Sequence, residues 1–141
     1  MDLTCSPVVP ADAGTIFELC KALIDQYEDI STIDYDTVLA WVRRKIEENI
    51  SEYRRILLGG VHAGYFHFCP ADEGWELDDL YVFPEFRNRG IGTAIIRKCC
   101  EKGPVMLYVF RKNTGALALY HRLGFREVGT AGKTRLILRK E

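Results

Sequence analysis

The sequence predicts a mixed α/β fold in which helices flank a β-sheet. Three observations support this prediction. Two segments near the start carry apolar residues at helical spacing, two extended runs in the middle are joined by a pair of glycines, and extended and helical segments alternate after Trp75. The 141 residues are 48% hydrophobic and 28% charged, which is typical of a chain that buries a core, so we expect one domain over residues 1–141.

Two helices are expected first. One begins at Ala11 or Asp12 and ends near Tyr27, because apolar residues recur inside it at helical spacing: Ile16, Leu19, Cys20, Leu23 and Ile24. The other begins after a cap at Asp34 or Asp36 and places one apolar stripe inward: Val38, Leu39, Val42 and Ile46.

Three strands are expected next. Residues 54–58 and 61–68 are extended runs separated by Gly59 and Gly60, which is a signal for a two-residue hairpin. A third strand covers residues 75–83 and ends at Pro84.

The rest of the chain is expected to alternate between helix and strand. Residues 93–102 form a helix that ends at Gly103, and Asn113 caps another helix that runs through Leu123 before Gly124. Between them, residues 105–110 form a continuous apolar run, which predicts a central strand buried on both faces. The last two strands are expected at residues 125–128 and 134–138.

Charge is distributed unevenly along the chain. Residues 1–42 contain eight acidic residues and one base, Lys21, so they carry −7 although the whole chain carries −1. The two portions are expected either to face partners of opposite charge or to be ordinary solvated surfaces. Scattered arginines in the second portion give little support to nucleic-acid binding, and we expect no such partner.

Neither a metal site nor a membrane segment is predicted. The five cysteines form no Cys-x-x-Cys pair and are expected to be reduced and mostly buried: Cys5, Cys20, Cys69, Cys99 and Cys100. The histidines have no spacing typical of a metal site and receive no role: His62, His67 and His121. Because the first residues lack a signal sequence and no run is long enough to span a bilayer, we expect a cytoplasmic protein.

The strongest functional signal is the segment from Arg87 to Gly92, Arg-Asn-Arg-Gly-Ile-Gly, which lies between a predicted strand and a predicted helix. Glycines allow a close approach of the backbone to an anion, and the free N–H groups of a helix N-terminus bind phosphate. Arg87 and Arg89 add positive charge. The alternative is a tight turn with two surface arginines.

Two other phosphate motifs fit poorly. A dinucleotide fingerprint would need glycine at Ile95. A P-loop ending in Gly132-Lys133-Thr134 would need glycine at Glu127 and a following helix, whereas extended residues follow.

With these segments in order, the chain resembles the GNAT superfamily of acyl-coenzyme A-dependent N-acetyltransferases over nearly its whole length. The resemblance rests on Leu80-Tyr81-Val82-x-Pro84, the loop 87–92, the strand 105–110, Asn113-x-x-Ala116-x-x-x-Tyr120, and Gly124-Phe125. It implies a mixed sheet that splays between its fourth and fifth strands and admits the thioester there. It also implies these contacts to acetyl-coenzyme A: Leu80, Tyr81, Val82, Arg87, Asn88, Arg89, Gly90, Ile91, Gly92, Thr93, Asn113, Ala116 and Tyr120.

Acetyl transfer to an amine needs a base and an acid. Family members often place a carboxylate base on the fourth strand, and we rank Glu76 first and Asp78 second. The period of a strand puts these two on one face and Asp79 and Tyr81 on the other, unless a bulge intervenes. The resemblance places Tyr120 near the cofactor sulfur as the acid. The alternatives are solvated strand acids and a core aromatic.

The predicted activity is direct transfer of an acetyl group from acetyl-coenzyme A to a primary amine. The acceptor site is expected on the first two helices and their connection, at Tyr27, Glu28 and Asp29, where acidic residues favour a cationic small molecule, a lysine or an N-terminal amine. The aromatic residues there equally suit an aromatic amine. The alternative function is a non-catalytic sensor of coenzyme A or acyl-coenzyme A, and the chain is expected to be a monomer or homodimer.

Overall fold

The computed structural model describes all 141 residues. Seven strands form one sheet in the order β1-β2-β3-β4-β5-β7-β6. Neighbouring strands are antiparallel except for β4 and β5, which are parallel. The strands are β1 (Leu3–Pro7), β2 (Tyr53–Leu58), β3 (Val61–Ala71), β4 (Gly74–Val82), β5 (Val105–Phe110), β6 (Arg126–Ala131) and β7 (Arg135–Lys140).

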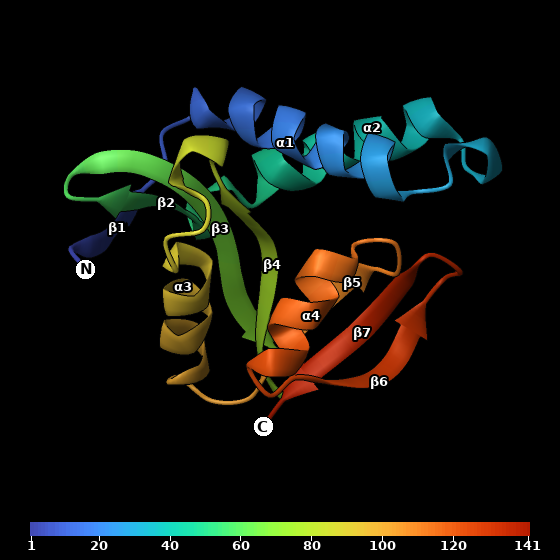
Figure 1. Cartoon of the computed structure of the whole chain (residues 1–141). Helices are drawn as coiled ribbons and strands as arrows, with labels where there is room; N and C mark the ends of the chain where they lie inside the picture. The colour runs from blue at the N-terminus through green and yellow to red at the C-terminus, as the bar shows by residue number, and fades with distance from the viewer.

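Four α-helices cover the two faces of this sheet (Figure 1). They are α1 (Asp12–Tyr27), α2 (Tyr35–Glu48), α3 (Ile91–Cys100) and α4 (Thr114–Arg122), with short 3₁₀ turns η1 (Ile30–Thr32), η2 (Ile50–Glu52) and η3 (Pro84–Phe86). The longest, α1, has 16 residues, and none of the helices combines the length and apolar character needed to span a bilayer.

Each face of the sheet has its own core. Helices α1 and α2 bury residues such as Ile16 and Ile46 against Tyr53, Tyr65 and Tyr81 of the sheet. On the other face, α3 buries its apolar side against the sheet, and α4 packs beside it. The α3/α4 core includes Ile91, Ile95, Ile96, Cys99, Ile56, Phe66, Leu77 and Leu107. The mixed α/β prediction is therefore confirmed.

Most predicted elements are present, with shifted ends. The first strand was not predicted, because β1 is a five-residue edge strand whose extended form depends on pairing with β2. Helix α3 begins at Ile91 rather than Thr93, directly after Gly90. Strand β5 lies inside the sheet as expected, but the prediction that both its faces are buried is wrong. Tyr108 is 39% exposed with the Arg135 guanidinium over its ring, whereas Phe110 on the same face packs against Tyr27 of α1.

The sheet opens between β4 and β5. Only Trp75 with Val105 and Glu76 with Met106 are paired, although β4 continues to Val82 and β5 to Phe110. The splay that the family resemblance implied is therefore confirmed. Beyond Glu76, the β5-facing edge of β4 has no strand partner.

Candidate active site

The segment between β4 and α3 exposes backbone N–H groups at one end of the splay. Gly90 adopts a left-handed conformation with φ of 80° and provides no side-chain cap for α3. The Ala94 N–H donates to the Gly90 carbonyl, so the N–H groups of residues 91–93 precede the first helical hydrogen bond. A Cβ atom at Gly92 would meet nothing within 4 Å, so the backbone there is open to a close ligand. These features suit a phosphate group.

The predicted loop residues differ in what they offer. Arg87, Asn88 and Arg89 are exposed, whereas the side chain of Ile91 is buried in the core, which leaves only its backbone for binding. The Arg87 Nε donates to the Val82 carbonyl at 3.0 Å, which ties the loop to the end of β4. Thr93 and Gly92 are half-buried in the first turn of α3.

Strand β4 presents its free edge beside this loop. Leu80 and Val82 point to the α3/α4 face and Tyr81 points to the α1/α2 face. Beyond Glu76, some of their N–H and C=O groups face the opening, where an extended amide chain could pair with them as an added strand.

Helix α4 packs on the α3/α4 face of the sheet. The Asn113 side chain accepts a hydrogen bond from the Ala116 N–H at 3.2 Å and so caps the helix, as predicted. Tyr120 is half-buried and packs edge-on against Phe125, with ring centroids 5.5 Å apart. Burial raises the pKa of Tyr120 to about 12, and the Asp78 carboxylate acts in the same direction. The phenol therefore remains protonated at neutral pH.

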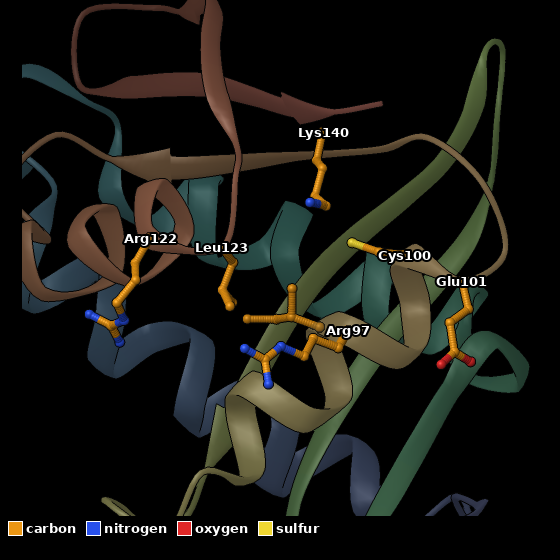
Figure 2. Close-up of a pocket in the computed structure, with 7 residues that line it drawn as sticks. Arg97, Cys100, Glu101, Arg122, Leu123 and Lys140 are labelled. Atoms are coloured by element: carbon orange, nitrogen blue, oxygen red, sulfur yellow. The ribbon is translucent and has the colours of Figure 1, made fainter.

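A pocket of about 410 Å³ lies between α3 and the end of α4 (Figure 2). Arg97 and Lys140 approach it from opposite sides, and Arg122 and Leu123 border it at the end of α4. Its only acidic residue is Glu101. The basic residues Arg97, Arg122 and Lys140 are far apart in the sequence, and only the packing of α3 beside α4 and β7 brings them together.

A β-bulge in β4 corrects the predicted orientation of its acids. The pairing with β3 shifts between Phe66 and His67, and Asp79 has a positive φ of 47°. Asp78 contacts Lys45 of α2, and Asp79 accepts a hydrogen bond from the Tyr53 hydroxyl at 2.8 Å. The prediction that Asp79 and Tyr81 face away from Asp78 is therefore wrong, because the extra residue brings all three to the α1/α2 face.

The two candidate bases lie in different surroundings. Glu76 sits where β4 and β5 part, is half-buried, and makes no ion pair or side-chain hydrogen bond. Burial and the Asp78 carboxylate raise its pKa. Burial disfavours ionisation of Asp78 too, but His67 and Lys45 outweigh it and hold the pKa of Asp78 below its ordinary value. A poorly basic, paired carboxylate is the weaker candidate, which favours Glu76.

His67 was not recognised as part of this site. Its Nε2 lies 2.9 Å from a carboxylate oxygen of Glu52, and its Nδ1 lies 3.8 Å from Asp78 Oδ2. The pairing of His67 with Asp78 across β3 and β4 depends on the bulge, so sequence spacing alone could not reveal it.

The predicted acceptor residues lie on the α1/α2 face. Tyr27 stacks on Phe110 at the end of β5, with ring centroids 6.3 Å apart. The Glu28 carboxylate accepts the Asp29 N–H, and the Asp29 carboxylate accepts hydrogen bonds from Ser31. Of the two carboxylates, Glu28 is the freer, because its one hydrogen bond comes from a neighbouring backbone N–H.

Comparison with known proteins agrees with this architecture. Residues 16–125 match the model of the acetyltransferase (GNAT) family, and this range contains β4, α3, β5 and α4. The chain therefore belongs to the GNAT acetyltransferase family.

Relatives and solved structures show the same likeness. An uncharacterised N-acetyltransferase of Methanocaldococcus jannaschii is 45% identical over 58 residues, which cover 37% of this chain and 26% of that protein. The thialysine N-epsilon-acetyltransferase of Sus scrofa is 43% identical over 61 residues, covering 39% and 36%. The chain thus matches only about a quarter to a third of these relatives. The crystal structure of a PaiA N-acetyltransferase from Thermoplasma acidophilum with coenzyme A has a TM-score of 0.71 at 19% identity, over 100% of this chain and 99% of that one.

Proposed function

We propose that this protein transfers an acetyl group directly from acetyl-coenzyme A to a primary amine. The observation that carries the proposal is the free edge of β4, which joins an exposed helix N-terminus at one end to a half-buried carboxylate, Glu76, at the other. Such a strand edge suits a long ligand with phosphates at one end and an acyl thioester at the other.

The N–H groups of residues 91–93, with Arg87 and Arg89, are expected to bind the pyrophosphate. The edge of β4 from Leu80 to Val82 is expected to pair with the amides of the pantetheine arm.

The reaction requires removal of a proton from the acceptor. An amine with a pKa of about 10.4 is neutral in about one molecule in 2,500 at pH 7, a deficit of roughly 4.6 kcal/mol. In the proposed mechanism Glu76 accepts this proton, directly or through water, and the neutral amine attacks the thioester carbonyl carbon. The carbon–sulfur bond then breaks, and the Tyr120 hydroxyl donates a hydrogen bond or proton to the departing thiolate.

A cationic acceptor is favoured over an acidic one. Glu28 and Asp36 make no ion pair, and they lie on the side of the sheet that Glu76 faces. The relative from Sus scrofa carries a name that specifies an ε-amine of thialysine, which supports a small molecule or peptide with a side-chain amine here as well. The stacked Tyr27 and Phe110 rings offer an apolar contact for its carbon chain.

The first test is a thermal melt with acetyl-coenzyme A, NADH or ATP in parallel. At about 100 times the dissociation constant, selective binding stabilises the fold by about 2.7 kcal/mol, or roughly 5 to 10 °C in Tm for a chain of this size. We expect the rise with acetyl-coenzyme A only. Arg89→Glu is expected to reduce the rise in Tm by placing a negative charge in the loop proposed to bind the pyrophosphate, whereas Arg44→Glu, at an exposed position on α2, should leave it unchanged. A rise with NADH or ATP alone contradicts the proposal.

Tyr120→Phe tests the acid. Because the phenol is expected to stabilise the leaving thiolate, we expect kcat to fall about 10- to 100-fold with little change in KM for acetyl-coenzyme A. The rate is measured as the release of free coenzyme A thiol from acetyl-coenzyme A in the presence of each of a set of candidate amines. Phe125→Leu, which alters the ring that Tyr120 packs against, is the control for a packing effect. Full turnover in Tyr120→Phe with an unchanged Tm rules out the acid role.

The same assays separate the alternative, a non-catalytic coenzyme A sensor. Such a module binds acetyl-coenzyme A in the melt, but it releases no thiol with any amine and is insensitive to Glu76 and Tyr120 substitutions. If an amine causes release of thiol from acetyl-coenzyme A and Tyr120→Phe slows that release, the protein is an enzyme rather than a sensor.

A further inference from the structure

Three side chains that commonly bind metal ions meet at the end of the sheet near η2. The donor atoms of Glu52, His67 and Cys69 all lie within 4.8 Å of one another. His67 and Cys69 are two residues apart on β3, so their side chains leave the same face. Glu52 ends η2 immediately before Tyr53, which pairs with His67. Three donors from two segments are thus held together by the pairing of β2 with β3.

The second ring nitrogen of His67 supplies an independent observation. Its Nε2 faces Glu52, whereas Nδ1 is buried, has no hydrogen-bond partner, and lies 3.8 Å from Asp78 Oδ2. His67 itself is 3% exposed. A histidine that binds a metal through one nitrogen usually directs its other N–H toward a carboxylate, which fixes the ring. Glu52, His67 and Asp78 lie in this order, although at 3.8 Å the Nδ1 does not donate a hydrogen bond to Asp78.

The charges around these donors favour a divalent cation. Glu52, Glu76, Asp78 and Asp79 all lie near His67, and Lys45 of α2 is the nearby cationic side chain. Tyr53 stacks on the imidazole and adds no charge. Burial and the carboxylates of Glu52, Glu76 and Asp78 raise the pKa of Cys69 to about 11, so its thiol is protonated at neutral pH. A bound metal ion reverses this preference, because a coordinated thiol is deprotonated.

We propose that Glu52, His67 and Cys69 form a zinc site. One carboxylate, one imidazole and one thiolate are a donor set that suits Zn²⁺ and does not suit Mg²⁺ or Ca²⁺. On binding, the Cys69 sulfur forms a bond to zinc and its proton passes to solvent. The Glu52 side chain is 38% exposed, so it provides the route of entry and leaves a fourth position open to water.

This site goes beyond the proposed acetyl transfer, which has no step that uses it, and it runs against the expectation of no metal from the sequence. Zinc would hold η2 against β3 and place a positive charge beside Asp78 and Glu76. The spacing between Glu52 and His67 is unlike any sequence motif for zinc, because their contact depends on strand pairing.

Cobalt provides a direct spectroscopic test. Untagged protein, freed of metal with EDTA and kept reduced, is titrated with Co²⁺. We expect one equivalent to bind with a near-ultraviolet thiolate-to-cobalt absorption band, and Zn²⁺ to displace it. Cys69→Ser should lose the band, and Glu52→Gln should bind at least tenfold more weakly. Cys100→Ser is the matched control, because Cys100 is a half-buried cysteine on α3.

A thermal melt provides the second readout. At a free Zn²⁺ concentration of about 100 times the dissociation constant, Tm should rise by about 5 to 10 °C in the wild type and in Cys100→Ser, but not in Cys69→Ser. Neither measurement uses acetyl-coenzyme A, so its outcome is independent of the proposed activity. Cobalt binding without the thiolate band, no binding, or an equal rise of Tm in Cys69→Ser would overturn the zinc site.

Discussion

Glu76→Gln is expected to lower kcat for acetyl transfer by about 10²- to 10⁴-fold, the usual contribution of a positioned general base. Glu76 lies where β4 and β5 part, and no cation pairs with it. Burial and Asp78 raise its pKa above the ordinary value of 4.5, so the carboxylate is a better proton acceptor than a solvated one. The kcat/KM of the wild type should rise as the pH increases through this raised pKa. The Glu76→Gln variant should not show this rise on the acidic side of its pH profile.

Stability distinguishes this effect from damage to the fold. Because the folded protein holds the Glu76 proton more tightly than the unfolded chain does, the contribution of this group is present at low pH and is lost as pH rises through the raised pKa. Glu76→Gln should therefore leave Tm unchanged or slightly higher at pH 7. Asp78→Asn is the comparison, and it should lower Tm because it breaks the pair with Lys45. An unchanged pH profile in Glu76→Gln removes Glu76 from the mechanism.

Gly64→Ala is expected to destabilise the protein by about 1–3 kcal/mol or more, which lowers Tm by roughly 3 to 10 °C. Gly64 lies opposite Val82 in the β3–β4 pair, where an added Cβ clashes with the Tyr81 carbonyl oxygen and lies 3.1 Å from the Val82 Cα. Both obstacles are backbone atoms, so no side-chain rotation relieves the clash. The strands must separate at the segment that we expect to bind the pantetheine arm.

The measurement is a pair of melts, with and without acetyl-coenzyme A. Gly64→Ala should show both the lower Tm and a smaller shift with the ligand. Gly14→Ala is the control: Gly14 lies in α1, where an added Cβ would meet nothing within 4 Å, so alanine should stabilise the helix by about 0.5–1 kcal/mol. An unaltered Tm in Gly64→Ala contradicts the close approach of β3 and β4.

Local patterns were sufficient to predict most of the fold. Helical spacing predicted α1 and the inward face of α2, and Asp34 and Asn113 cap their helices as expected. The glycine pair at 59–60 lies in the turn of a hairpin, as predicted, and the apolar run at 105–110 forms an interior strand. These features are decided by neighbours in the chain, through backbone capping, turn conformation and side-chain period. The short edge strand β1 has no comparable local signal and requires its partner.

The sequence by itself therefore determined the layered α/β architecture, the family, and the segment whose N–H groups are free at the start of α3. Tertiary structure alone decided which charged groups share a site. The bulge at Asp79 places the acidic side chains of β4 on one face of the sheet. Lys45 of α2 forms an ion pair with Asp78, and the pairing of β2 with β3 brings Glu52 within hydrogen-bond distance of His67. The physical reason is that a pKa or a ligand set depends on distance in space, whereas a motif records only distance along the chain.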